Sequence, residues 1–315
     1  MNRPVIIGTR GSDLALWQAN FVKKRLESLH PNIDFAVEVI STTGDRVVDV
    51  SLSKIGDKGL FTRQIEENLL DGRIDLAVHS LKDLQTSQSV GIKIGAVCER
   101  EVPNDALISR DGVSLSELPE GAVIATGSLR RRSQLLAFRQ DLRIVDIRGN
   151  VPTRLKKFDG SESDAMILAY AGLSRLGLSE RIAEVISTEI MLPAVGQGAV
   201  AVEVRNVEDE ITAMVASLDH DETRVCVLAE RSFLRRLEGG CQVPIGALAT
   251  TDGREVSITG YVGALDGSVS FRKTISGAAG SAEELGDRLA EDLIGLGAGR
   301  LLDDARTDSQ IGSFG

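Results

Sequence analysis

The stretch Val5-Ile6-Ile7-Gly8-Thr9-Arg10-Gly11-Ser12-Asp13-Leu14 decides the fold class of this chain. An apolar run leads into a glycine-punctuated turn, and apolar residues then recur at helical spacing as far as residue 29, which predicts a strand, a turn and a helix. Ser12 or Asp13 is expected to cap the helix. Residues 35–40 alternate, 61–70 suit a helix and 74–78 suit a buried strand. This β-α-β-α-β order is typical of an α/β lobe.

A second stretch begins in the same way. Residues 122–125 suit a strand, Thr126-Gly127-Ser128 a turn and 129–138 a helix, followed by strand-like runs at 144–147 and 165–168 and a helix around 173–176. The repeated pattern predicts two doubly wound lobes. The apolar run 199–204 fits either lobe by its pattern alone.

The pattern changes again near residue 221. A long helix is expected over 222–237, hairpin strands over 256–262 and 269–275, and a helix over 283–296, which together predict a smaller α+β C-terminal domain. The fold class is therefore α/β, with two doubly wound lobes and this third domain. The expected boundaries are 1–98 with 199–216 for the first lobe, 104–192 for the second and 221–315 for the third, with the chain crossing over at Gly198.

Composition limits the classes of function. The chain has 315 residues, of which 42% are hydrophobic, which suggests two or three domains. A formal charge of −10 and 3% aromatic residues argue against a nucleic-acid partner. No apolar run approaches the roughly 18 residues of a membrane span, and the start is unlike a signal peptide. We expect a cytoplasmic protein with no membrane partner.

Cations nevertheless gather in one part of this acidic chain, which indicates a small polyanionic ligand. The arginines between residues 130 and 154 are Arg130, Arg131, Arg132, Arg139, Arg143, Arg148 and Arg154. Ser12 and Ser128 each stand where a strand turns into a helix, a place that favours carboxylate or phosphate. An ordinary serine N-cap explains each serine equally well, but Arg10 precedes the first and Arg130 follows the second, and guanidinium groups pair with carboxylates.

Three further motifs carry polar residues at turns. Lys82 and Asp83 follow a predicted strand end, either as a surface ion pair or as part of a site for a ligand that develops positive charge. Residues 42–59 form a polar, glycine-rich stretch that suits a lid as well as a plain loop. Cys241 stands in Gly239-Gly240-Cys241-Gln242-Val243-Pro244, a turn that presents its thiol as nucleophile, ligand or packing. Cys98 and Cys226 lie in apolar runs and are expected in the core, and no spacing predicts a metal site.

Taken together, these motifs resemble the porphobilinogen deaminase family, also called hydroxymethylbilane synthases. The resemblance runs in order along nearly the whole chain and rests on the motifs Arg10-x-Ser12-x-Leu14-Ala15-Leu16-Trp17-Gln18-Ala19, Lys58-Gly59-Leu60-Phe61, Val78-His79-Ser80-x-Lys82-Asp83, Ser128-Leu129-Arg130-Arg131, Arg148-Gly149-Asn150-Val151-x-Thr153-Arg154-Leu155, Leu192-Pro193-Ala194-Val195-Gly196-Gln197-Gly198-Ala199 and Leu237-Glu238-Gly239-Gly240-Cys241-Gln242-Val243-Pro244-Ile245-Gly246. Departures at Asp13, Gly127, Leu84-Gln85, Val102 and Asn104 touch none of the key positions.

The resemblance implies a monomeric transferase of heme biosynthesis with lobes like those of periplasmic binding proteins. It joins four porphobilinogen molecules head to tail into hydroxymethylbilane and releases ammonia, on a dipyrromethane cofactor that a thioether links to Cys241. Asp83 is then the catalytic carboxylate. The implied cofactor-binding residues are Lys82, Thr126, Ser128, Arg130, Arg131 and Gln197, and the implied substrate-binding residues are Arg10, Ser12, Lys54, Lys58, Phe61, Arg148, Arg154 and Arg175. Arg132, Arg139 and Arg143 are left as surface residues.

Two other classes of function compete with this one. The first is a two-lobed protein that binds small anions without catalysis, which needs neither a covalent adduct nor Asp83. The second is a hydrolase with Cys241 as nucleophile and His79 or His220 as base. With three histidines in the chain and no supporting motif, the hydrolase is the weaker alternative.

Overall fold

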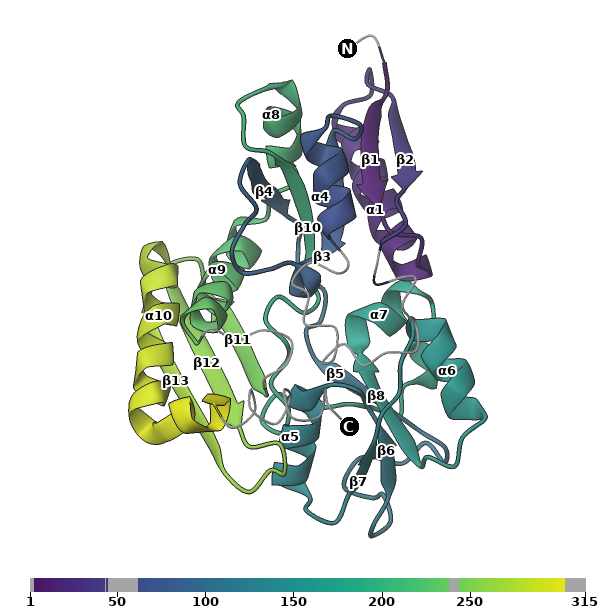
Figure 1. Cartoon of the computed structure of the whole chain (residues 1–315), viewed down its shortest axis with the longest axis vertical. Coiled ribbons are helices and arrows are strands. Elements are labelled where there is room, and N and C mark those ends of the chain that lie inside the picture. The colour runs from purple at the N-terminus through teal and green to yellow at the C-terminus, as the bar shows by residue number, and fades with distance from the viewer. Residues whose placement is uncertain (1–2, 43, 45–61, 238–243, 304–315) are drawn as a thin grey trace. The chain divides into compact units, whose positions relative to one another are not determined.

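The computed structural model describes residues 3–42, 44, 62–237 and 244–303. These residues form two compact units: the first takes its residues from 3–44, 62–101 and 198–224, and the second from 102–197 and 225–303 (Figure 1). Within the described ranges, no helix is both long and apolar enough to cross a membrane.

A five-stranded mixed sheet forms the centre of the first unit, in the order β2-β1-β3-β10-β4. β1 pairs in parallel with β2 and β3, whereas β10 runs antiparallel to both β3 and β4. The strands are β1 (Val5–Thr9), β2 (Phe35–Val39), β3 (Leu76–Ser80), β4 (Ile92–Val97) and β10 (Val200–Arg205). The run 199–204, which fitted either lobe by its pattern, therefore lies in the first sheet.

Helices cover both faces of this sheet. Ala19, Val22 and Leu26 of α1 (Asp13–Leu29) pack with α8 (Glu210–Ala216) on one face, and Ile65 and Leu69 of α4 (Arg63–Leu70) pack on the other. Successive side chains of each strand point to opposite faces of the sheet, so they pack in turn against the helices on one face and on the other. A 3₁₀ helix, η1 (Leu81–Asp83), follows β3 directly.

The second lobe repeats the first sheet with its own strands, in the order β7-β6-β8-β5-β9. β6 pairs in parallel with β7 and β8, and β5 runs antiparallel to β8 and β9. The elements are β5 (Asp105–Ser109), β6 (Val123–Ala125), α5 (Leu129–Phe138), β7 (Arg143–Val145), α6 (Val151–Asp159), β8 (Ala165–Ala169), α7 (Tyr170–Arg175), η2 (Ser179–Arg181) and β9 (Glu184–Val185). The sequence pattern missed β5, β9 and α6, which are short or lack alternation.

The C-terminal part is an antiparallel sheet covered by two helices. Its elements are α9 (Asp221–Arg236), β11 (Ile245–Thr251), β12 (Glu255–Gly263), β13 (Ser270–Ala278), η3 (Ala279–Ser281), α10 (Ala282–Leu293) and the distorted turn η4 (Ile294–Ala298). Within the second unit the buried Glu230 of α9 accepts hydrogen bonds from Gly196 N at 2.8 Å and Ala249 N at 2.9 Å. This carboxylate therefore ties the end of the second lobe to β11. The expected fold class is confirmed.

Asp75 gives a testable prediction about stability in the first unit. Its buried carboxylate accepts bonds of 2.7 Å from both Arg3 nitrogens and 2.8 Å from Ile6 N. Burial alone would raise the pKa of Asp75, but these bonds and the charges of Arg3 and Arg205 outweigh it and lower the pKa. We expect Asp75→Asn to reduce the free energy of unfolding at pH 7 by on the order of 1–3 kcal/mol, because the charged acceptor is lost.

The pH dependence of that loss has a defined sign. A lowered folded-state pKa contributes stability above the unfolded value of about 3.9, and this stability disappears as the pH falls through the folded-state pKa. The difference in Tm between the wild type and Asp75→Asn should therefore be full at neutral pH and shrink below about pH 4. A difference that stays constant with pH would contradict the lowered pKa of Asp75.

Candidate active site

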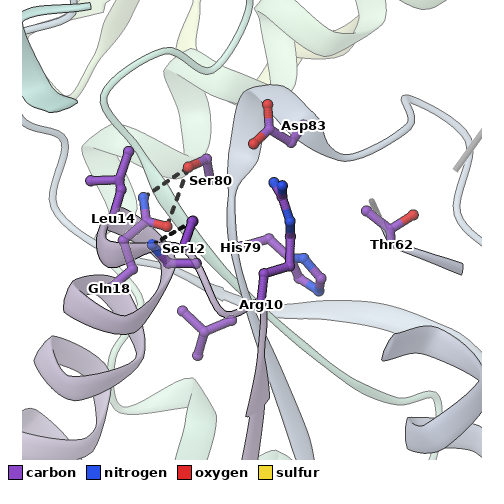
Figure 2. A pocket seen from close by; sticks show the side chains of 10 residues that line it. Arg10, Ser12, Leu14, Gln18, Thr62, His79, Ser80 and Asp83 are labelled. Atoms are coloured by element: carbon purple, nitrogen blue, oxygen red, sulfur yellow. Dashed lines mark hydrogen bonds between the residues drawn. The ribbon is translucent and has the colours of Figure 1, made fainter. Parts of the chain in front are cut away.

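The first unit has a pocket where β1 and β3 end. Arg10 follows β1 directly, Ser12 stands at the start of α1, and Asp83 is the last residue of η1, beyond β3. All three line the pocket, with Thr62, His79 and Ser80 among the other lining residues (Figure 2). Parallel strands present their carboxyl ends at the same edge of a sheet, which is where α/β folds bind ligands. Two motifs some 70 residues apart in the sequence thus meet in one pocket.

The pocket combines a cation with a carboxylate. Arg10 is half-buried and Asp83 is exposed. A guanidinium group can bind a ligand carboxylate through paired hydrogen bonds, and a carboxylate can accept N–H groups or stabilise developing positive charge. The pocket therefore suits a ligand that carries acids at one point and becomes cationic at another. Ser12 caps α1 through a long bond of 3.4 Å from Ala15 N, so its N-cap role is real and it also faces the pocket.

Sequence reasoning missed part of this pocket. Ser80 and the buried Gln18 hydrogen-bond each other at 2.8 Å, and both line the pocket beside Thr62. Ser80 had a usable signal, because it is the last residue of a predicted strand that ends at the site. Lys82 is half-buried next to Asp83 but does not line this pocket.

Four predicted site residues, Lys54, Lys58, Phe61 and Cys241, lie outside the described residues, as does most of the stretch 42–59. Their roles stay predictions.

The second lobe gathers Arg130 and Arg131 around one fully buried carboxylate, Asp105. Arg130 Nη1 donates to Asp105 Oδ2 at 2.7 Å and to the Leu192 carbonyl at 2.6 Å. Arg131 donates to Asp105 Oδ1 through Nη2 at 2.7 Å and Nε at 3.1 Å. Gln197 Nε2 donates to the same oxygen at 3.0 Å. Three predicted cofactor-binding residues therefore share one partner, which the sequence analysis did not include in the site.

This cluster, Asp105, Arg130, Arg131 and Gln197, has an excess of positive charge. Burial alone would raise the pKa of Asp105, but the two guanidinium groups hold it well below its usual range. Asp105 is therefore ionised, and two cations against one anion leave a net charge of +1 in a buried setting. Within the described residues, the hydrogen bonds of Arg130 use Nη1 alone, so Nε and Nη2 remain as donors. An additional acidic group would complete the charge balance.

The remaining predicted residues of the second lobe lie around its strand ends. Ser128 caps α5, accepting from Arg131 N at 3.5 Å, and Thr126 is buried just before it. Arg154 is half-buried on α6 and donates through Nε to the Gly149 carbonyl at 2.7 Å. Arg148 precedes α6 and Arg175 ends α7, both half-buried. Binding of ligand by these residues stays a prediction.

Arg139 is not a plain surface residue as expected. Its guanidinium donates to the carbonyls of Leu115, Leu118 and Pro119 and pairs with Asp141 at 2.6 Å. It therefore joins the end of α5 to the preceding loop, because carbonyls that lack helix or sheet partners need a donor. Arg132 and Arg143 are exposed, as expected.

The fold is that of an α/β protein with two lobes, and its pocket and its buried cluster both offer guanidinium groups that suit acidic ligands. A family model described as "Porphobilinogen deaminase, dipyromethane cofactor binding domain" matches residues 5–213, and one described as "Porphobilinogen deaminase, C-terminal domain" matches residues 224–295. The chain belongs to the porphobilinogen deaminase family.

Relatives support this assignment along the full length. A porphobilinogen deaminase of Pelotomaculum thermopropionicum is 51% identical over 310 residues, 98% of this chain and 99% of that protein. One of Desulforudis audaxviator is 52% identical over 303 residues, 96% of this chain and 98% of its own.

Among solved structures, the periplasmic aliphatic sulphonate binding protein SsuA from Escherichia coli aligns over 76% of this chain and 71% of its own, with 16% identity and a TM-score of 0.40.

The residues present fit the dipyrromethane group named for this family. Each pyrrole ring of such a group bears acidic side chains, and the buried cluster around Asp105 has the net positive charge and spare donors that acids require. The N-terminus of α5, capped by Ser128, adds a positive helix end next to it.

Proposed function

We propose that this chain is a hydroxymethylbilane synthase, which joins four porphobilinogen molecules head to tail and releases ammonia at each addition. The observation that supports this most is the pocket in which Arg10 and Asp83 meet, in a chain that belongs to the porphobilinogen deaminase family. The dipyrromethane group, linked by a thioether to Cys241, supplies the primer to which substrate is added. We further propose that the protein is cytoplasmic and monomeric. Its sedimentation in solution would test the monomeric state.

The chain's own residues have separable roles in this proposal. Arg10 binds the acidic side chains of the substrate, and Ser12 adds a hydroxyl and a helix N-terminus on the same side. Asp83 accepts pyrrole N–H groups and stabilises the positive charge that develops when the amine leaves. An exposed carboxylate can do this without first breaking a buried ion pair.

The second lobe supplies binding residues for the acids of the bound pyrroles. Arg130 and Arg131 are preorganised by Asp105, so little side-chain entropy is lost when an acid binds. Further hydrogen-bonding groups of this lobe come from Thr126, Ser128 and Gln197. In the first unit, Lys82 supplies a cation. As the bound oligopyrrole lengthens, substrate is proposed to be bound by a further set of residues: Arg148, Arg154, Arg175, Lys54, Lys58 and Phe61.

Intact-protein mass spectrometry tests the covalent group. We expect an added mass equal to a dipyrrole on the wild type, and its loss in Cys241→Ser, because a hydroxyl cannot form the thioether. Cys98→Ala is the matched control, since Cys98 is a buried cysteine that the proposal does not use, and it should keep the added mass. An unmodified Cys241 in active enzyme would refute the covalent cofactor.

A further inference from the structure

Three buried side-chain atoms in the first unit lack a hydrogen-bond partner. They are Thr62 Oγ1, His79 Nε2 and Glu203 Oε2, and they make up the full set of such atoms among the described residues. Thr62 and His79 line the same pocket as Asp83 (Figure 2). A buried polar atom without a partner costs about 1–3 kcal/mol. Two of these atoms belong to residues that line the pocket, and the third lies 3.1 Å from His79 Nε2, so the group requires a functional explanation.

Strand pairing places His79 against Glu203. In the antiparallel pair of β3 and β10, His79 stands opposite Ala201 and Glu203 opposite Ala77, so all four side chains point to the same face of the sheet. This is the face that α4 covers, since Ala77 packs with Ile65 and Leu69. The pairing of β10 with β4 shifts register between Val202 and Glu203, and such bulges commonly redirect side chains next to active sites.

The two groups are close and almost completely buried. His79 Nε2 lies 3.1 Å from Glu203 Oε2, and each side chain is 3% exposed. The distance is that of an ion pair, yet neither atom completes a hydrogen bond of good geometry. The contact therefore leaves both atoms able to accept a further partner or to change their protonation.

Burial restricts how this pair can be charged. A neutral imidazole next to an ionised carboxylate would leave an uncompensated negative charge in a dry site, which is strongly unfavourable. The pair is instead neutral when it holds one additional proton, either on the ring or on the carboxyl. Arg10 and Asp83 are the other charged residues of the described part of the chain that line the pocket with His79, and their opposite charges do not force this proton off.

We propose that His79 and Glu203 form a proton-exchange pair for the reaction, with Glu203 acting as the positioning residue that keeps a proton on the histidine side of the pocket. The proposal rests on the proposed function, because it concerns the proton balance of amine release. His79 is the member that reaches the pocket.

The proton balance closes in two steps. The substrate's aminomethyl group enters as an ammonium, so when its C–N bond breaks the electron pair leaves with nitrogen as ammonia. The ammonia then takes the proton of the pair and departs as ammonium. The pair is then negative, beside the positive charge that Asp83 also stabilises. When the new C–C bond forms, the reacting pyrrole carbon loses its proton, and this proton returns to the pair. In each addition the His79–Glu203 pair therefore donates one proton and accepts one proton, and no oxidant or reductant is involved.

Variants of both residues test the proposal. We expect Glu203→Gln and His79→Gln each to lower kcat by about 10²-fold with little change in KM, because a positioned acid–base group contributes on that order. The double variant should lose no more than either single one, since the two act as a unit. The pH profile of kcat should also change its shape, because protons must then be exchanged with water.

A control separates this role from a structural one. Asp75→Asn removes another buried carboxylate of the same unit that does not line the pocket, so it should lower Tm and leave kcat and its pH profile unchanged. Variants of Glu203 that lose activity without any change in the shape of the pH profile would overturn the proposal, as would normal kcat. Inactive wild-type protein would instead refute the proposed function.

A measurement on the wild type keeps the test decisive if the variants fail to fold. The chain has three histidines, so ¹⁵N-histidine NMR spectra can be assigned with His30→Gln and His220→Gln. We expect the ¹⁵N signal of His79 Nε2 to be that of a nitrogen sharing a proton with Glu203, with the proton bound either to Nε2 or to the facing carboxyl oxygen. An Nε2 signal typical of an unprotonated nitrogen that accepts no hydrogen bond would overturn the pair.

Discussion

Asp83→Asn should lower kcat by about 10²–10³-fold while KM changes little, because a carboxylate that stabilises charge mainly in the transition state contributes on this order. The amide keeps the shape of the side chain but removes its charge. Asp83 is exposed at the end of η1, so the substitution should not disturb the core. Hydroxymethylbilane formation under saturating porphobilinogen is the measurement.

Two controls accompany this variant. Asp34→Asn removes the same charge from an exposed position of the first unit that does not line the pocket, and it should keep full activity. The mass of Asp83→Asn should still include the dipyrrole, which shows that the cofactor is bound and that turnover is what failed. Near-normal product formation by Asp83→Asn would remove Asp83 from the catalytic role.

Asp105→Asn should strongly destabilise the second lobe. The carboxylate is fully buried and balances Arg130 and Arg131 through bonds of 2.7 Å to each. Removing one side of a buried ion pair leaves cations without compensation and costs about 3–5 kcal/mol. We expect this loss in urea unfolding followed by circular dichroism, together with weaker retention of the dipyrrole.

Asp141→Asn is the matched control for that loss. It breaks an Arg–Asp pair of the same lobe at 2.6 Å, but its partner Arg139 has other acceptors and the carboxylate is partly exposed. Only a small change in the urea midpoint is expected, because solvent screens such pairs. If Asp105→Asn were no more destabilising than Asp141→Asn, the buried cluster would not have the role assigned to it.

The sequence predicted the repeated lobes well because their signal is local. Apolar runs, glycine-punctuated turns and helical spacing act over a few residues, so β1, α1, β6 and α5 were expected from their own residues. β5, β9 and α6 were missed because short or interrupted elements depend on neighbours for their stability. β10 had a clear strand pattern, but its place between β3 and β4 depends on contacts more than 100 residues away along the chain.

The candidate site divides in the same way. Arg10, Ser12 and Asp83 were predicted because arginine, serine and aspartate at strand ends have a recognisable chemistry, and the family motifs strengthened each choice. The sequence by itself thus determined the class of fold, the acidic nature of the ligand and most of the residues proposed to bind it. Asp105 gave no such signal, since a lone aspartate at the start of a short strand resembles many surface residues.

Only the tertiary structure decided which charges balance one another. It placed Asp105 between two arginines and set Glu203 3.1 Å from His79, whereas the sequence left His79 as a possible base for a hydrolase. The physical reason is that the free energy of a charge depends on burial and on the nearest opposite charge. Both are properties of the packed chain, and residues distant in sequence supply them.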